Sequence, residues 1–253
     1  MSRSGRRRDP RRNLNVPQAR AQPGVLDELA ALGPFFAVQA HRPGAAPEPS
    51  WRPLAELTQP PGLEERVGLV RGALAARAGY SASGIELRVA VSVTQLGVVA
   101  RIVAPALAAL TVQQPLDLRL SGLWWQDTAG GPVPLSVPEP AGGVLASPEQ
   151  LLDEVVTPIT VTAAALAPVS PRVLWGNVAS AINGAASQVA KARPELAAAA
   201  WVTAATFFRH SQLSTEPGPP GPSFRRSSCC LIYRLAPGRN GPICDDCVLA
   251  RRR

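Results

Sequence analysis

Apolar residues recur at helical spacing in two segments of the first half of the chain. They line one face, at intervals of three and four residues, from Leu63 to Leu74 and again from Val89 to Leu107, which predicts two amphipathic helices. Ser83 and Glu86 precede the second segment at the spacing of a capping box, so this helix is predicted to begin beside them. Pro105 lacks a backbone N–H and predicts a kink or an end just before it.

Three more helices are predicted in the second half. Ser147 and Ser170 are each followed directly by proline, and serine at the N-cap with proline at the first helical position is a typical helix start. The second of these starts opens a predicted helix from Val173 to Lys191. Pro194 permits a fifth helix from Glu195 to Phe208, which is apolar almost all round and is therefore expected to be buried.

The pattern of apolar residues changes between the helix predicted to run to Leu107 and the helix predicted to start at Ser147. Residues 116–120 alternate between leucine and polar residues, a period of two that predicts a strand on a half-exposed sheet. Residues 124–125 and 133–137, on either side of glycines 130–131, predict a small hairpin, in which three prolines allow the second strand only an edge position. The proline-rich stretch 42–61 is predicted to be a loop. The chain as a whole predicts an α+β fold dominated by helices.

The net charge of +8 is concentrated at the two ends of the chain. Residues 1–20 hold seven arginines and one acid, and residues 251–253 are all arginine, so the body between them carries a net charge of −1. A near-neutral body argues against a nucleic-acid groove built into the fold. The first 24 residues are expected to form a disordered basic tail, with weak adhesion to an anionic membrane or to nucleic acid as the functional alternative.

The sequence shows no sign of export or of a membrane span. The arginine-rich start lacks the apolar run of about 7–15 residues that a secretory signal needs. Residues 89–110 are long enough to span a membrane but include Gln95 and Arg101, and residues 196–208 are too short for the roughly 20 residues required. We therefore expect a soluble protein in a reducing compartment, where clustered thiols are more often metal ligands than disulfides.

All four cysteines lie within the last 25 residues, after a Pro-Gly-Pro-Pro-Gly-Pro stretch at 217–222 that predicts a linker or rigid loop. Cys244 and Cys247 form a Cys-x-x-Cys pair, which places two thiolates on one metal with little strain. Cys229 and Cys230 are adjacent, which suits a zinc ribbon poorly because neighbouring side chains of an extended chain point to opposite faces. A two-iron cluster spreads its ligands over a wider object, although a local turn is still needed. Spacing alone leaves open an iron–sulfur cluster, a structural zinc ion, and a redox dithiol or vicinal disulfide.

At these residues the sequence resembles the FhuF-like ferric-siderophore reductases. In that family a vicinal cysteine pair followed by Cys-x-x-Cys binds a [2Fe–2S] cluster, and the matching stretch here runs from Arg225 to Arg234 together with 244–247. A second match, Leu174-Trp-Gly-Asn-Val-Ala-Ser-Ala181, is similar to the family's tryptophan-glycine-asparagine helix start. The resemblance covers roughly residues 85–250. The 13 residues between Cys230 and Cys244 exceed the spacing of the founding members, and the extra loop costs little because closure entropy rises only logarithmically.

The resemblance implies that Cys229, Cys230, Cys244 and Cys247 hold a [2Fe–2S] cluster and that the protein reduces a ferric siderophore in the cytoplasm. Adding one electron converts Fe³⁺ on hard oxygen donors to a more weakly held Fe²⁺, so reduction is release. The implied substrate is a ferric siderophore, suspected to be of the hydroxamate type. Trp175, Asn177 and Arg209 are candidates for lining its side of the site. The favoured alternatives are that Trp175 is a core residue and that Asn177 is a hydrogen-bond partner at the end of its helix.

Few other chemical groups are present. His41 and His210 are the only histidines, and neither a Ser-His-Asp arrangement nor a nucleotide-binding glycine motif occurs. A separate electron donor, such as a ferredoxin or a reductase, is therefore expected. Cations near an anionic cluster favour its reduced form, and four arginines flank the thiols: Arg225, Arg226, Arg234 and Arg239.

The expected organisation is a basic tail at 1–24, a helical α+β domain at 25–216 and a cluster-binding segment at 217–253. Two other functions fit the same residues. One is an iron–sulfur redox sensor or electron-transfer protein that reduces no siderophore. The other is a zinc-stapled relative of siderophore biosynthesis proteins. No transmembrane segment is expected, and the basic tail leaves room for peripheral contact with the inner membrane surface.

Overall fold

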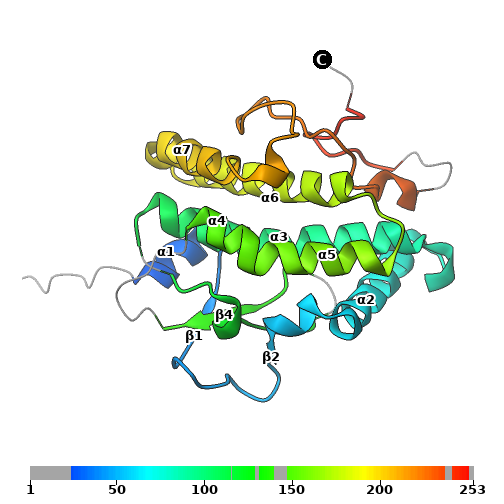
Figure 1. Ribbon diagram of the computed structural model, residues 1–253, viewed down its shortest axis with the longest axis horizontal. Helices are drawn as coiled ribbons and strands as arrows, with labels where there is room; N and C mark the ends of the chain where they lie inside the picture. The colour runs from blue at the N-terminus through cyan, green and yellow to red at the C-terminus, as the bar shows by residue number, and fades with distance from the viewer. Residues whose placement is uncertain (1–23, 115, 129–130, 140–146, 237–240, 251–253) are drawn as a thin grey trace, which may run out of the picture.

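The computed structural model describes residues 24–250 apart from residue 115 and the segments 129–130, 140–146 and 237–240. The basic tail and the terminal arginines predicted above therefore lie outside the described residues. The fold is mostly helical and also contains a small sheet, which confirms the α+β class (Figure 1). The elements in chain order are α1 (Val25–Ala31), β1 (Gln39–His41), β2 (Arg52–Pro53), α2 (Pro60–Ala78), α3 (Leu87–Thr111), β3 (Trp124–Trp125), β4 (Leu135–Pro138), α4 (Pro148–Leu151), α5 (Thr157–Leu166), α6 (Pro171–Ala192) and α7 (Ala197–Phe207).

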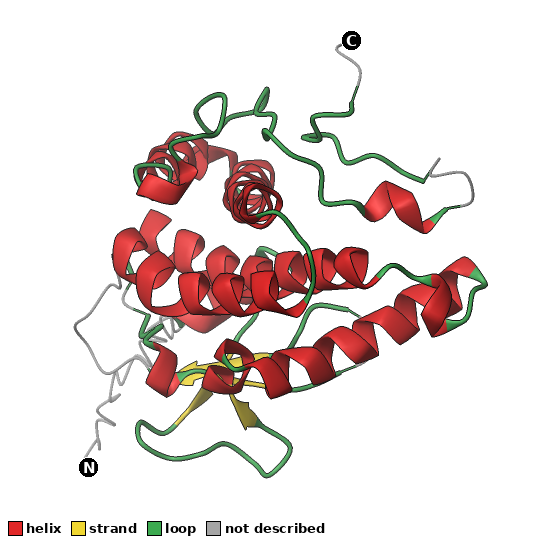
Figure 2. Ribbon diagram, turned by 45° about the vertical axis from the view of Figure 1, so that its right-hand side comes forward, coloured by secondary structure: helices red, strands yellow, loops and turns green. Residues whose placement is uncertain are grey.

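Helix α3 is the centre of the molecule. It packs against α6 and α7 on one side and against α2 and α5 on the others, and Figures 1 and 2 show the sheet on the side of α3 away from α6. Among the described residues, α3 is the one helix long and apolar enough to cross a membrane, but 72% of its apolar window is buried inside the protein. Its apolar faces are therefore explained by core packing.

The prediction for α3 is wrong about the capping box and about an end at Pro105, while a kink at that proline stays a prediction. The helix begins at Leu87 with Glu86 at the N-cap and no side-chain cap, while Ser83 lies in a separate 3₁₀ turn, so the capping box does not form. The helix also continues through Pro105 to Thr111. Proline in a helix interior costs about 3 kcal/mol, and here the residues around it are almost completely buried, so packing on several sides offsets the loss.

The two serine–proline helix starts are confirmed. The Ser147 hydroxyl accepts a hydrogen bond from the Gln150 N–H, and that of Ser170 accepts one from the Arg172 N–H. A π-helical turn, Leu152–Val156, joins α4 to α5. The fifth helix forms, but the expectation that it is buried is wrong. Val202 is 67% exposed, because α7 lies at the outer surface and packs through an alanine-lined face.

The sheet has the order β1-β4-β3-β2. The hairpin is confirmed, since Trp125 pairs with Leu135 in antiparallel register. Its second strand is not an edge, however, because β1 pairs with it in parallel on the other side. Leucines 116 and 118 are buried as their alternation indicates, but no regular strand forms over 116–120. The stretch 42–61 is not entirely loop: it includes β2, a 3₁₀ turn and the first residues of α2, where proline loses no hydrogen bond.

Arg101 is a charged residue on the buried side of α3. It is 3% exposed, and its guanidinium donates hydrogen bonds to the backbone carbonyls of Val133, Ala37 and Phe35. Burial lowers the pKa of Arg101 to about 10, which still leaves it protonated at neutral pH. The side chain thus ties α3 to the residues just before β4 and to the segment after α1.

Candidate metal centre in the C-terminal segment

Residues 223–236 lie against α6 and the start of α3 (Figure 1). Side chains fix it at three points. The Glu216 carboxylate accepts hydrogen bonds from the Ser227 N–H at 2.8 Å and from its hydroxyl at 3.0 Å. The Ser228 hydroxyl donates to the Arg172 carbonyl at 3.0 Å. The Arg234 guanidinium donates two hydrogen bonds to Glu86, at 2.6 and 2.9 Å.

At Gly176 of the tryptophan-glycine-asparagine motif, helix α6 and the C-terminal segment are in close contact. A Cβ atom at this position would lie 2.2 Å from the Ser228 Oγ, well inside van der Waals contact. Glycine is therefore needed in α6 because the residue before Cys229 packs directly on the helix. The motif and the cysteine segment, although far apart in the chain, form one structural unit.

A tight turn orients the vicinal pair. Leu231 has a left-handed backbone with φ of 71°, which is rare for leucine and typical of strained functional sites. This conformation brings the Leu231 N–H back to the Cys229 Sγ at 3.4 Å. The predicted local turn is thus present. In the second pair, the Cys247 N–H donates to the Cys244 carbonyl at 3.0 Å and closes the Cys-x-x-Cys turn.

The four thiols are free and form two pairs. The Sγ atoms of Cys230 and Cys244 are 3.7 Å apart, and the Cys229 thiol lies beside that of Cys247. Two thiolates on one tetrahedral metal, each at about 2.3 Å, are about 3.8 Å apart, so the first spacing fits shared ligation. Within the described ranges no three His, Cys, Asp or Glu side chains converge on one point. Two separate pairs fit a two-iron group better than one four-coordinate zinc ion.

The electrostatics of the site also suit thiolates. The hydrogen bond with the Cys244 thiol, together with the Arg226 guanidinium, lowers the pKa of Cys230 to about 5. The same hydrogen bond raises the pKa of Cys244. Burial raises the pKa of Cys229 to about 12. The site therefore favours a thiolate at Cys230, whereas the thiols of Cys229 and Cys244 need a metal to lose their protons.

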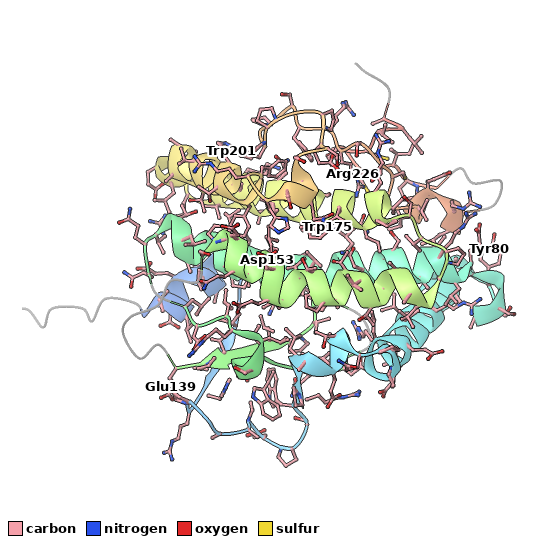
Figure 3. The ribbon with its side chains drawn as sticks, viewed as in Figure 1. Tyr80, Glu139, Asp153, Trp175, Trp201 and Arg226 are labelled. Atoms are coloured by element: carbon pink, nitrogen blue, oxygen red, sulfur yellow. The ribbon has the colours of Figure 1, made fainter. Side chains whose placement is uncertain are left out.

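Arg226 is 1% exposed and lies over the start of α6 (Figure 3). Burial lowers its pKa, but Asp246 and the neighbouring thiols Cys230 and Cys244 outweigh that effect and keep the pKa above its ordinary value. Its Nε and Nη2 atoms have no hydrogen-bond partner among the described residues, and the Asp246 carboxylate, at 3.6 Å from Nη2, is beyond hydrogen-bond length. A buried cation with two unused donors beside thiols fits an anionic group bound there.

The other flanking arginines are placed differently. Arg225 donates to the backbone carbonyls of Asp245 and Cys247, and Arg234 is paired with Glu86. Arg239 lies outside the described residues. Of the three flanking arginines that the structure describes, Arg226 is the buried cation with donors to spare.

The three residues suggested for the siderophore side have separate places. Asn177 is 0% exposed and bonds only within the protein, so the suggestion that it lines a ligand site is wrong. Trp175 stacks on His210 with ring centroids 5.4 Å apart and borders a cavity of about 480 Å³. Arg209 lines a neighbouring cavity of about 220 Å³.

Sequence reasoning missed the residues that support the segment from α3. Ser92 donates its hydroxyl to the Cys230 carbonyl at 2.9 Å, and Gln95 accepts from Asn177 at 3.1 Å. Both are fully buried. Two polar side chains on an otherwise apolar helix face were the available signal, because buried polar groups require partners.

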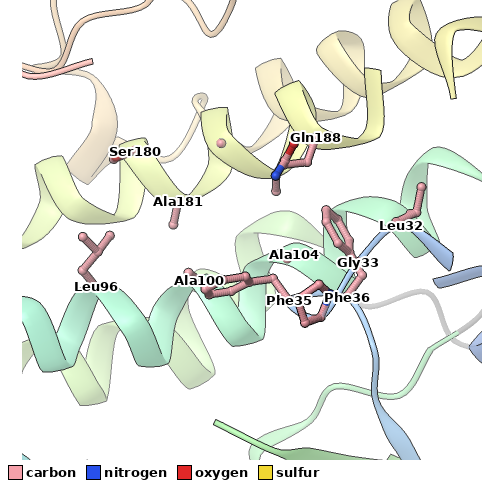
Figure 4. Close-up of a pocket in the computed structure, with 13 residues that line it drawn as sticks. Leu32, Gly33, Phe35, Phe36, Leu96, Ala100, Ala104, Ser180, Ala181 and Gln188 are labelled. Atoms are coloured by element: carbon pink, nitrogen blue, oxygen red, sulfur yellow. The ribbon is translucent and has the colours of Figure 1, made fainter. Parts of the chain in front are cut away.

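A further cavity, of about 250 Å³, lies between α3, α6 and the segment after α1 (Figure 4). Its lining is almost entirely apolar, with Phe35, Leu96 and Ala181 facing it, and Gln188 and Ser180 are the polar side chains on its wall. It offers no titratable or metal-binding side chain to a redox reaction.

Comparison with known proteins adds one finding. A family model of the FhuF 2Fe-2S C-terminal domain matches residues 226–249, a stretch that includes all four cysteines. No curated protein matched the sequence. Residues 226–249 therefore match the 2Fe-2S domain of FhuF-like proteins, which supports an FhuF-like family and points to a [2Fe–2S] cluster in the C-terminal segment.

Proposed function

We propose that this protein is a ferric-siderophore reductase whose [2Fe–2S] cluster is held by Cys229, Cys230, Cys244 and Cys247. The observation that carries the proposal is the pairing of these four thiols next to a buried arginine within the stretch that matches the FhuF 2Fe-2S domain. The cluster, when bound, supplies one electron at a time. The substrate Fe³⁺ gains that electron and leaves its oxygen donors as Fe²⁺.

The chain's own residues orient the thiols and hold the segment that carries them against the helical domain. The turns at Leu231 and at 244–247 orient the thiols as two pairs. The anchors at Glu216 and Ser228 hold the segment on α6, which keeps the electron carrier on a folded domain with Cys229 and Cys244 partly exposed. No acid or base is needed, because the reaction moves an electron and no proton at the reacting atom. A separate protein donor replenishes the electron, and free thiols suit the cytoplasm.

The cavity beside Trp175 is our candidate for siderophore docking. Its volume of about 480 Å³ lies in the range of small-ligand sites. Arg172 lines it and also accepts the Ser228 hydrogen bond through its carbonyl, so the cavity adjoins the residues that lead into the vicinal cysteines.

The reductase is tested by mixing anaerobically purified, dithionite-reduced protein with a ferric hydroxamate siderophore. Oxidation of the protein, followed by its visible absorption, should accompany the appearance of Fe²⁺ trapped by a ferrous chelator. The gallium complex of the same siderophore is the control, since it has the same shape and accepts no electron. If the reduced protein keeps its electron in the presence of several ferric siderophores, the sensor or electron-transfer function replaces this proposal.

The docking site is tested by filling the cavity. Thr215, an exposed lining residue, is changed by T215W, and the exposed neighbour Ser214, which does not line the cavity, provides the matched control S214W. We expect T215W to raise the KM for the ferric siderophore at least about tenfold, since burial of a ligand in such a site is lost, with the reduction potential unchanged. Equal KM values for the two variants would remove this cavity from the proposal.

A further inference from the structure

Arg226 and Asn177 belong to a closed ring of buried polar contacts around Cys230. The Arg226 Nη1 donates to the Asn177 Oδ1 at 3.1 Å. The Asn177 Nδ2 lies 3.1 Å from both the carbonyl and the hydroxyl of Ser92, and the Ser92 hydroxyl donates to the Cys230 carbonyl. The Arg226 guanidinium in turn lies beside the Cys230 thiol.

Every member of this ring is inaccessible to solvent. Asn177, Ser92 and Cys230 are 0% exposed and Arg226 is 1% exposed. Electrostatic interactions in such an interior are stronger than in water, because the effective dielectric constant is lower. An arginine in this position therefore acts on a nearby anion far more than an arginine on the surface does.

The geometry leaves Arg226 with one donor group occupied and two available. Asn177 fixes Nη1, and the planar guanidinium then has a defined orientation, so the directions of Nε and Nη2 are defined as well. Those two atoms have no partner among the described residues, and the guanidinium that carries them lies beside the thiols Cys230 and Cys244. Hydrogen bonds to the sulfurs and local positive charge are two of the factors that set the potential of an iron–sulfur cluster.

We propose that Arg226 is the residue that raises the reduction potential of the bound cluster, and that Asn177 is the positioning residue that directs its free donors toward the sulfurs. The inference rests on the cluster part of the proposed function and is independent of the siderophore as substrate. It gives the asparagine of the tryptophan-glycine-asparagine motif a specific role, in which the motif supports the redox group and does not contact the substrate.

The test measures the midpoint potential of cluster-loaded protein by anaerobic dye titration. R226Q should lower the equilibrium constant for one-electron reduction about tenfold, which corresponds to about 59 mV. The matched control is R225Q, the neighbouring arginine, which bonds to backbone carbonyls and should change that constant less than about twofold. R226K, which keeps the charge but loses the planar fork, should give an intermediate value and serves if R226Q does not retain the cluster.

The positioning role of Asn177 is tested by comparing the midpoint potential of N177A with that of the control variant N183A. Asn183 lies on the same helix and also bonds to the C-terminal chain, accepting from the Gly221 N–H at 2.8 Å, but it does not contact Arg226. N177A should lower the potential and N183A should not. In the R226Q background N177A should cause no further shift, because the two residues act through one contact.

The possible outcomes distinguish failure of this inference from failure of the proposed function. Equal shifts for R226Q and R225Q, or a shift for N177A that persists in full without Arg226, would overturn this inference and leave the reductase proposal intact. Failure of the unmodified protein to bind a cluster would overturn both. A cluster with the expected shifts but no transfer to ferric siderophores would support this inference and contradict only the substrate.

Discussion

The contact between Gly176 and Ser228 gives a sharp prediction for the variant G176A. The added methyl group would lie 2.2 Å from the Ser228 Oγ, so that atom must move by more than 1 Å to reach ordinary contact at 3.4 Å. Rotating it away breaks its hydrogen bond to the Arg172 carbonyl, at a cost of about 1 kcal/mol. Alanine meanwhile stabilises a helix interior by about 1 kcal/mol relative to glycine. The free energy of global unfolding should therefore change little.

The attachment of the cysteine segment should nevertheless weaken, because the lost contact lies immediately before Cys229. A cost of about 1 kcal/mol shifts a local opening equilibrium about fivefold, so the cluster should be lost about five times faster in G176A. The assay is the decay of the visible cluster absorption in the presence of an iron chelator, with unfolding by urea measured in parallel.

Two further variants make the reasoning refutable. G184A, on the same helix, adds a methyl group with no atom within 4 Å, and it should leave the rate of cluster loss unchanged. In S228A the clashing oxygen is absent, so adding G176A should have little further effect. Faster cluster loss from G176A that is undiminished in the S228A background, or no change in G176A alone, would contradict the account.

Three other predictions concern the fold and the cofactor. Replacing Arg101 by methionine leaves three buried or partly buried carbonyls without their donor. The free energy of unfolding, measured by urea denaturation, should fall by about 3 kcal/mol or more, whereas R119M at an exposed ion pair should cost less than about 1 kcal/mol. Equal losses would show that the Arg101 contacts carry no extra stability. Burial lowers the pKa of His41, with an opposing effect from Glu139. As the pH falls below the ordinary pKa near 6.5, the unfolded chain therefore binds more protons than the folded protein, and the free energy of unfolding should decrease between pH 7 and pH 5. The variant H41Q should reduce that pH dependence. Removing the cluster should leave the far-ultraviolet circular dichroism nearly unchanged, because the core is formed mainly by the helices and the sheet, to which the cysteine segment adds Phe224 and, in part, Leu235. A large loss of helical signal would show that the helices depend on the cluster.

Much of the helical architecture could be predicted from local signals. Ser147 and Ser170 mark helix starts because a serine oxygen satisfies an N–H at the first turn, and this interaction involves only neighbours in the chain. Pro105 was misleading for the opposite reason, since its local cost is outweighed by packing from distant elements. Strand β1 was not foreseen, because three residues paired with β4 almost a hundred positions later leave no periodic pattern.

The functional site shows the same contrast between local signals in the chain and contacts between distant residues. The cysteine motif indicated the chemistry directly, since the thiols are close in the chain. The selection of Arg226 from four arginines could not be made from sequence, because it depends on Asn177, which lies 49 positions away, and on Ser92, whose contact with Cys230 spans 138 positions. The motif around Gly176 was recognisable as a pattern, but its reason, the close packing of Ser228, appears only in three dimensions.

The central claim is that the four C-terminal cysteines hold a [2Fe–2S] cluster, and electron paramagnetic resonance of the dithionite-reduced protein tests it most directly. The account predicts a signal from a spin of one half, integrating to one spin for every two iron atoms, that disappears when Cys230 is replaced by serine. A colourless protein that contains zinc and gives no such signal would contradict it.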